Sequence, residues 1–411
     1  MKHITTTLSL LTTLALTHSA WTLDWPQWRG PNRDGVSAEI GLLTKWPEGG
    51  PQLLWRAQGA GAGFSSVVTA GSVVYTLGDL EDGCYLIALD TKGKHLWKGR
   101  VGDTGGHRKY PGPRSTPTVT GGKVYVLGQH GDLVCFDAQA QKEVWRANVA
   151  KDFGGTMMSG WRWSESPLVD GDQLVVTPGG TKGAMVALDK ATGKEIWRCK
   201  DFTDRAGYSS IIIREIGGRR QYIQLTGESV AGVEAESGKL LWKAARKGRT
   251  AVVSTPVFDK GHLFVTSAYN VGCNGFKVSY DGNAYKAEQV YSHAGGAGMA
   301  NHHGGVIRVG EYVYGSNGGQ LSCIHLATGK VMWNERSAGK GAITIVDGKI
   351  ILRTERGPVS LVEVNPKEYK EISRFDQPDR TRARAWSHPI VSSGILYLKD
   401  QDTLFAYNLN Q

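Results

Sequence analysis

A repeated phrase is the feature of this sequence that most constrains its fold. The phrase ends in A-L-D-x-x-T-G-K-x-x-W, and its clearest copy runs from Ser166 to Trp197. Copies of this ending place tryptophans at intervals of about 40 to 50 residues, with one final gap about twice as long. These residues are Trp55, Trp97, Trp145, Trp197, Trp242 and Trp333. We assign the two periods that lack the tryptophan to Val290 and Ile372, which gives eight periods.

Each period contains four short segments in which β-branched and aromatic residues alternate with polar ones, separated by Gly, Asp or Asn. Such alternation predicts antiparallel strands, and four strands in about 40 to 50 residues is typical of a β-propeller blade. After Ile372 only three strands remain, whereas an unattached strand surrounds Trp55. Pairing these segments would remove two exposed sheet edges. The sequence therefore predicts one all-β domain over residues 51–411, an eight-bladed propeller of four-stranded antiparallel blades, closed by an N-terminal strand.

The repeat explains most of the conspicuous residues without chemistry. We expect the repeat tryptophans to pack between neighbouring blades, because aromatic side chains bury large areas. The aspartates of A-L-D are expected to cap their own turns. Cys135 and Cys323 fall where other copies carry alanine, which indicates buried packing positions. The five cysteines are scattered without a C-x-x-C pair, so we expect neither a disulfide framework nor a zinc site.

The residues before the repeats divide into two parts. Residues 1–20 combine a short basic start with a Leu/Thr-rich apolar stretch and small residues, which predicts a secretory signal peptide. The apolar run is too short for a membrane span, and the first cysteine is Cys84, so no lipid-attachment cysteine follows the leader. Residues 21–50 form an N-terminal extension. We expect a periplasmic or secreted monomer that does not bind nucleic acid, although Lys and Arg (48) outnumber Asp and Glu (38).

The A-L-D-x-x-T-G-K-x-x-W phrase resembles the repeat of pyrroloquinoline-quinone (PQQ)-like propellers, over about residues 50 to 411. That superfamily includes quinoprotein alcohol dehydrogenases and the propeller lipoprotein of the outer-membrane barrel-assembly machinery. The opening DWPQWRGPNRDG, from Asp24 to Gly35, is similar to the start of many exported PQQ-like repeat proteins of unassigned role. The resemblance implies the fold. It leaves the function open, because the residues of the phrase are structural.

The loops that lead into the innermost strands are expected to converge around the central channel. They are rich in basic and aromatic residues, a combination that suits an anionic ligand. The expected ligand-binding residues are Arg162, Trp163, Glu165, Tyr208, Arg249, His302, Arg384, Trp386 and His388. The same loops carry Arg108, Arg114, Trp161, His303, Lys340 and Arg382. The alternative is that these polar loops only solvate one end of the channel.

Two function classes follow. In the first, the propeller is a binding or scaffold module for a protein partner or for an anionic small molecule or glycan. The alternative implied by the resemblance is a PQQ-dependent alcohol or polymer dehydrogenase, in which Ca²⁺ would need oxygen ligands such as Glu165, Asn301 and Asp204. Family dehydrogenases carry a vicinal disulfide, which this chain lacks. The sequence identifies no catalytic residue. Adjacent His302 and His303 point to opposite faces of a strand, so we expect no metal site.

Overall fold

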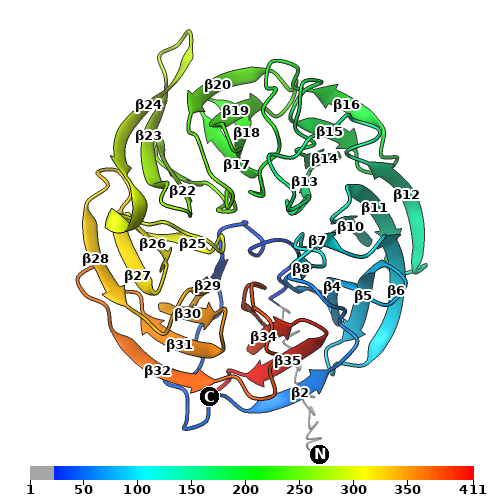
Figure 1. Cartoon of the computed structure of the whole chain (residues 1–411), viewed down its shortest axis with the longest axis vertical. Coiled ribbons are helices and arrows are strands. Elements are labelled where there is room, and N and C mark those ends of the chain that lie inside the picture. The colour runs from blue at the N-terminus through cyan, green and yellow to red at the C-terminus, as the bar shows by residue number, and fades with distance from the viewer. Residues whose placement is uncertain (1–22) are drawn as a thin grey trace, which may run out of the picture.

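The computed structural model describes residues 23–411, so the expected signal peptide lies outside the described residues. Eight blades, each of four antiparallel strands, are arranged around a central axis, and one blade gains a fifth, parallel strand on its inner edge (Figure 1). The first four blades consist of β3 (Val68–Ala70), β4 (Val73–Asp79), β5 (Cys84–Asp90), β6 (His95–Gly102); β9 (Thr118–Thr120), β10 (Lys123–Leu127), β11 (Asp132–Asp137), β12 (Lys142–Asn148); β13 (Leu168–Asp170), β14 (Gln173–Val176), β15 (Val186–Asp189), β16 (Glu195–Arg198); and β17 (Ile212–Ile216), β18 (Arg219–Leu225), β19 (Ser229–Glu234), β20 (Leu240–Ala245).

The remaining blades follow the same order from the channel outwards. They consist of β21 (Val257–Asp259), β22 (His262–Ser267), β23 (Gly272–Tyr280), β24 (Tyr285–His293); β25 (Val306–Val309), β26 (Tyr312–Asn317), β27 (Gln320–His325), β28 (Val331–Arg336); β29 (Gly341–Val346), β30 (Lys349–Thr354), β31 (Pro358–Glu363), β32 (Glu371–Asp376); and β33 (Ile390–Ser392), β34 (Ile395–Asp400), β35 (Thr403–Asn408), β2 (Leu53–Ala57). The short elements are β1 (Val36–Ser37), β7 (Gly106–His107), β8 (Tyr110–Pro111) and a 3₁₀ turn at Gly295–Ala297. Within residues 23–411 no helix has the length and apolar character needed to cross a membrane.

The N-terminal strand closes the ring, as the sequence predicts. β2 pairs antiparallel with β35, and Trp55 lies opposite Ala406. The last blade therefore takes three strands from the C-terminus and its outermost strand from the N-terminus. This pairing covers a strand edge that would otherwise be open.

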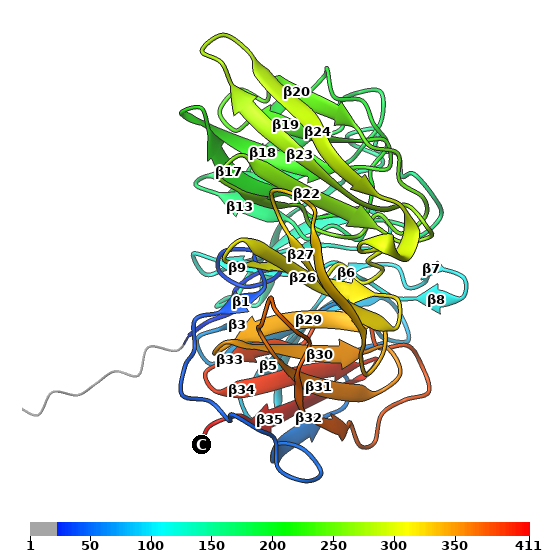
Figure 2. The same ribbon diagram turned by 90° about the vertical axis from the view of Figure 1, so that its left-hand side faces the viewer.

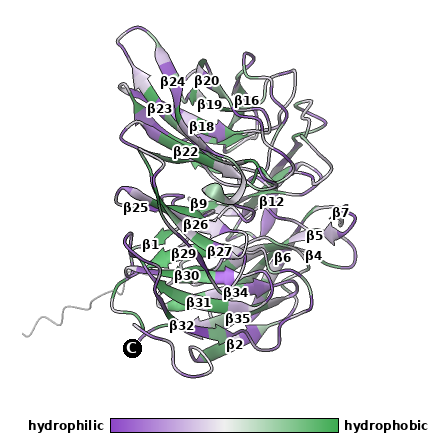
Figure 3. Cartoon of the chain, turned by 60° about the vertical axis from the view of Figure 1, so that its left-hand side comes forward, coloured by the Kyte–Doolittle hydropathy of each residue, from purple (hydrophilic) through white to green (hydrophobic). Residues whose placement is uncertain are grey.

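The core lies between the blades. Eight clusters of buried apolar side chains each join two neighbouring sheets. In Figure 3 the strands β29–β31 are coloured largely hydrophobic, whereas many connecting loops are hydrophilic. All five cysteines are free and buried, which confirms the expectation for Cys135 and Cys323.

Each repeat tryptophan links its blade to the next one. The Nε1 atom of Trp145 donates to the carbonyl oxygen of Lys190 at 2.9 Å, in the T-G-K turn of the following blade. Gly193 in that turn has φ +73°, and a Cβ there would lie 2.7 Å from the Trp145 ring. Glycine is thus required both by the backbone conformation and by the close approach of the ring. Asp189 caps the same turn, because its Oδ1 accepts hydrogen bonds from the amides of Ala191 and Thr192.

The assignment of Val290 to the missing tryptophan position is wrong by one residue. Trp197 lies opposite Ala187, and in the β21–β24 blade the equivalent pair is Tyr291 opposite Gly275. The Tyr291 hydroxyl donates to the carbonyl oxygen of Leu326 in the next blade, as the indole nitrogens of Trp145, Trp197 and Trp333 do. Val290 is 52% exposed. It occupies the β-bulge position directly before the packing position, as the exposed Val144 and Ile196 do in the second and third blades. Without the tryptophan to mark the packing position, the sequence does not distinguish these two neighbouring residues.

The assignment of Ile372 fails for the same reason. Ser373 lies opposite Leu361 and occupies the equivalent position. The space that a tryptophan fills elsewhere is occupied from another part of the chain. Trp46 of the N-terminal extension is buried against Phe375, and its amide donates to Ser373 Oγ at 3.0 Å.

Residues 24–37, the channel plug, cross the central opening of the ring (Figure 1). The carbonyl oxygens of Trp25 and Pro26 accept hydrogen bonds from the backbone amides of Thr69 and Val119, in the innermost strands of the first two blades. β1 pairs in parallel with β29. The guanidinium groups of Arg29 and Arg33 are buried and donate to carbonyl oxygens of four further loops and strands. Burial lowers the pKa of both arginines to about 10, so both remain charged at neutral pH. The plug explains the conspicuous DWPQWRGPNRDG opening, for which the sequence alone gave no role.

Candidate functional site

A cavity of about 320 Å³ lies at the loop end of the channel, above the plug. The loop before the first strand of every blade contributes a lining residue. The lining residues are Trp28, Phe64, Tyr110, Arg114, Trp161, Ser164, Tyr208, Ser210, Thr250, Ala251, Val253, Tyr269, His302, His303, Lys340, Glu355, Arg384, Trp386 and His388. We call this cavity the channel pocket.

Trp28 of the plug contributes to the channel pocket. Its Nε1 donates to Thr255 Oγ1 at 3.0 Å, and its ring centroid lies 4.5 Å from that of His388. His388 Nε2 lies 2.7 Å from the carbonyl oxygen of His303, so this nitrogen carries the proton. Burial lowers the pKa of His388 to about 3, and His388 is neutral at physiological pH.

Aromatic rings form one wall of the channel pocket. His107 of the β7–β8 hairpin stacks on Trp161 with ring centroids 3.7 Å apart, and this hairpin projects from the face of the ring (Figure 2). Tyr110 lies next to both Trp161 and Trp386, with centroid distances of 5.8 Å and 4.8 Å. Trp386 in turn packs on Phe64 at 4.4 Å. Rings from four different loops therefore hold one another in place.

Arg114 extends into this aromatic wall. Its guanidinium carbon lies 5.2 Å from the Phe64 ring centroid and 5.4 Å from that of Trp161. Its nitrogens donate to carbonyl oxygens, including that of Tyr110 at 2.7 Å. Among residues 23–411 Arg114 forms no ion pair. Burial lowers its pKa only to about 10, so it carries an uncompensated positive charge at neutral pH.

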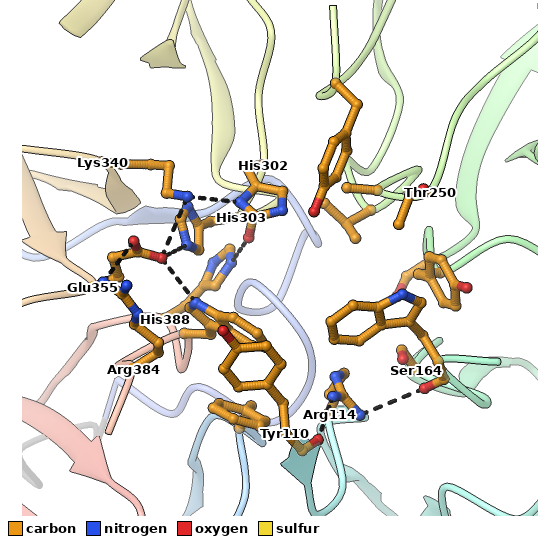
Figure 4. Close-up of a pocket in the computed structure, with 18 of the residues that line it drawn as sticks. Tyr110, Arg114, Ser164, Thr250, His302, His303, Lys340, Glu355, Arg384 and His388 are labelled. Atoms are coloured by element: carbon orange, nitrogen blue, oxygen red, sulfur yellow. Dashed lines mark hydrogen bonds and ion pairs between the residues drawn. The ribbon is translucent and has the colours of Figure 1, made fainter. Parts of the chain in front are cut away.

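A charged cluster faces Arg114 across the channel pocket (Figure 4). Glu355 accepts hydrogen bonds from Arg384 at 3.1 Å and from Trp386 Nε1 at 3.1 Å, and lies 3.2 Å from His303 Nε2. Burial alone would raise the pKa of Glu355, but the hydrogen bonds from His303 and Trp386 and the charge of Lys340 hold it well below its usual range. Glu355 is therefore ionised, and its charge is matched by Lys340 and Arg384.

His302, His303 and Glu355 also bring three metal-ligand atoms within 4.8 Å of one another. The sequence places no carboxylate at a useful spacing from these histidines, but the fold brings Glu355 to them. The Lys340 ammonium lies 3.0 Å from His302 Nδ1 and 3.5 Å from Glu355 Oε2. With Arg384 on the other carboxylate oxygen, two cations already surround Glu355, which disfavours a divalent ion there. The expectation of no metal stays a prediction.

The structure brings five of the nine predicted ligand-binding residues into the channel pocket. Tyr208, His302, Arg384, Trp386 and His388 all line it. Arg162 and Arg249 are exposed and lie outside its lining.

Trp163 and Glu165 point into the protein. Trp163 is 6% exposed and packs in the core between the second and third blades. Glu165 accepts hydrogen bonds from the amide of Thr177 at 2.6 Å and from Gln224. Burial raises the pKa of Glu165 to about 8, so the carboxyl is mostly protonated at neutral pH. In an extended segment residues two apart would face the same side, but Arg162 between them has a φ of 68°, which breaks the alternation. Trp161 therefore lines the pocket, whereas Trp163 turns into the core.

Sequence reasoning missed Glu355 and Trp28. Glu355 follows β30 and belongs to a loop between the second and third strands of its blade. Such loops lie on the same face of the ring as the loops that enter the innermost strands. A prediction that took both sets of loops into account would have identified Glu355. Trp28 belongs to the plug, and no pattern in the sequence places the plug in the channel.

The residues present do not fit a PQQ cofactor held over Ca²⁺. Glu355 is the single carboxylate among the described residues of the pocket lining, and two basic side chains neutralise it. Asp204 is paired with Lys243 and accepts from Thr226 and Ser229. Asn301 Oδ1 accepts from Ser254 and Gly304. Glu165 is hydrogen-bonded to Thr177 and Gln224. The three oxygen ligands suggested from the sequence are therefore each bonded to different protein groups.

The fold and the plugged channel define a PQQ-like repeat propeller. A family model described as outer membrane protein assembly factor BamB matches residues 85–297 and 277–410, more than half of the chain. The chain belongs to this family.

Curated relatives carry the same description. The BamB protein of Moranella endobia is 24% identical over 246 residues, which cover 54% of this chain and 58% of the relative. That of Burkholderia pseudomallei is 26% identical over 212 residues, 50% of this chain and 49% of the relative. The chain thus spans about half the length of these relatives.

Solved structures share the fold at low sequence identity. BamB from Moraxella catarrhalis is 15% identical with a TM-score of 0.54, covering 83% of this chain and 97% of that one. Quinohemoprotein alcohol dehydrogenase from Comamonas testosteroni is 12% identical with a TM-score of 0.63, covering 94% and 80%. At these identities the similarity concerns the fold alone.

Proposed function

We propose that this chain is an exported binding propeller whose channel pocket holds an anionic, ring-containing ligand. Residues 1–20 would act as the secretory leader, and residues 51–411 as the binding domain behind the plug. The observation that carries the proposal is Arg114, an unpaired guanidinium set among the rings of Phe64 and Trp161. Placing such a charge without a partner has a cost that a bound carboxylate would offset, and a guanidinium binds a carboxylate in a bidentate manner.

The pocket also offers groups for the rest of such a ligand. Ring faces of Trp161 and Trp386 provide apolar stacking surface, and Ser164 and Thr250 provide hydroxyl groups. With Arg114, Lys340 and Arg384 against Glu355 alone, the formal charge of the pocket is positive. A cavity that is mainly aromatic with a few placed polar groups is typical of small-molecule sites.

Isothermal titration calorimetry with digalacturonate and with PQQ as probes, at low and moderate salt, tests the proposal. Arg114→Ala should weaken binding of an anionic probe at least about tenfold, the effect of losing about one charge-assisted hydrogen bond. Arg162→Ala removes the same charge from an exposed loop position outside the lining and is the matched control. Equal affinities of the two variants would contradict the proposal and favour loops that only solvate the channel.

Family membership supports a second candidate, a protein partner. Relatives are named as outer membrane protein assembly factors, and a partner segment with an acidic side chain would meet the same pocket. In-cell crosslinking from a photoreactive residue at Trp161 tests this candidate. A reproducible protein adduct that Arg114→Ala abolishes supports it, and the absence of any adduct contradicts it.

A further inference from the structure

A second cavity, of about 230 Å³, adjoins the channel pocket. Phe64, Tyr110 and Arg384 line both cavities, so the two are direct neighbours. We call this second cavity the outer groove. Its remaining lining residues are Lys109, Pro111, Arg382, Ala383 and Gln401.

The position of the outer groove follows from the loops that form it. Lys109 and Pro111 belong to the β7–β8 hairpin, and Arg382 belongs to the loop that leads into β33. Gln401 lies between β34 and β35, and it links the loop into β33 to the loop into β3. Its Oε1 accepts from the Gly63 amide at 3.1 Å, and its Nε2 donates to the carbonyl oxygen of Arg384 at 3.3 Å. The groove therefore runs outward from the channel over the last blade.

All charged side chains that line the outer groove are basic. Lys109 and Arg382 are exposed, and neither forms an ion pair within residues 23–411. No acidic side chain lines the groove in the described part of the chain. Together with Arg114 in the channel pocket, three unpaired basic side chains lie along these two neighbouring cavities. A single small anion would use only one of them.

We infer that the pocket and the outer groove together bind a chain of acidic sugars, such as a uronic acid oligosaccharide. This inference rests on the proposed function and extends it to the class of ligand. The first two rings lie in the channel pocket with a carboxylate on Arg114, and the third and fourth rings lie along Lys109 and Arg382. Sugar rings offer flat apolar faces for Trp386 and Tyr110 and hydroxyl groups for the polar lining, whereas an acidic peptide offers no ring for the aromatic wall.

The experiment measures how affinity depends on ligand length. Digalacturonate and tetragalacturonate are titrated into the full mature protein by calorimetry, at one salt concentration. The wild type should bind the tetramer at least about tenfold more tightly than the dimer, because about one more charge-assisted contact forms. The double variant Lys109→Ala/Arg382→Ala should lose this gain and keep the wild-type affinity for the dimer.

The double variant Arg162→Ala/Arg249→Ala is the matched control, since it removes two exposed basic residues of the same face that line neither cavity. It should keep the tenfold gain. Equal affinity of the wild type for dimer and tetramer, or equal loss in both double variants, would overturn the inference while leaving dimer binding to Arg114 intact. Tetraglutamate binding as tightly as tetragalacturonate would overturn the assignment to sugars in favour of an acidic peptide. Failure of every probe to bind would overturn the proposed function, and the groove with it.

Discussion

At the scale of single residues, two tryptophans two positions apart have different roles. Trp163 is in the core between two blades, and Trp161 stacks on His107 in the wall of the channel pocket. Trp163→Ala should therefore lower the free energy of unfolding by about 3–5 kcal/mol, the usual cost of removing a buried aromatic side chain. Trp161→Ala should cost less stability but weaken ligand binding. Urea denaturation of both variants checks this, and equal stability losses would contradict it.

Two pocket histidines make a further residue-scale prediction about pH. Burial lowers the pKa of His302 and of His388 to about 3, from the ordinary value of 6.5. Unfolding then takes up protons between these values, so the free energy of unfolding should fall as pH decreases from 6.5 toward 3. His388→Gln places an amide nitrogen near the position of Nε2, so it keeps a donor for the His303 carbonyl but cannot titrate, and it should make this fall shallower. Melting temperatures at several pH values test it, and a slope identical to that of the wild type would contradict it.

At the scale of the blade, the link between neighbours depends on one position of the outermost strand. Tyr291 holds that position in the β21–β24 blade, with its hydroxyl on Leu326, whereas Val290 is 52% exposed. Tyr291→Ala should cost roughly 1–3 kcal/mol, and Val290→Ala should stay within about 0.5 kcal/mol, the range typical of surface changes. Tyr291→Trp should be tolerated, since other blades use tryptophan. Thermal denaturation of the three variants distinguishes this register from the one shifted by one residue.

At the scale of the whole molecule, residues 23–60 serve two separable purposes. β2 closes the ring, and the plug before it fills the channel. A chain of residues 51–411 should fold with a reduced melting temperature, because Trp25, Trp46 and the two plug arginines are missing. A chain of residues 61–411 also lacks β2, exposes the edge of β35, and should not fold. Circular dichroism melting of the two chains tests the closure, and identical behaviour would contradict it.

The sequence predicts the fold better than it predicts the site. Blade number, closure at Trp55 and the turn-capping aspartates follow from the repeat, because each copy reports the same local structure. Where a copy lacks its tryptophan, however, the sequence does not distinguish the packing position from the β-bulge residue before it, and this places Val290 in the position of Tyr291. The channel pocket is formed by loops whose sequences differ from one copy of the repeat to the next. Glu355 and Trp28 reach the pocket only through the closed ring, from segments that the loop pattern does not include.

The proposed ligand binds in the channel pocket, above the plug. Hydrogen exchange of the backbone amides, with and without saturating tetragalacturonate, locates this binding site along the chain. We predict slower exchange in residues 106–114, 158–164 and 380–388 and around Trp28, which come together only at the channel pocket and outer groove. Protection confined to the outermost strands, or spread evenly over the exposed basic residues, would contradict it.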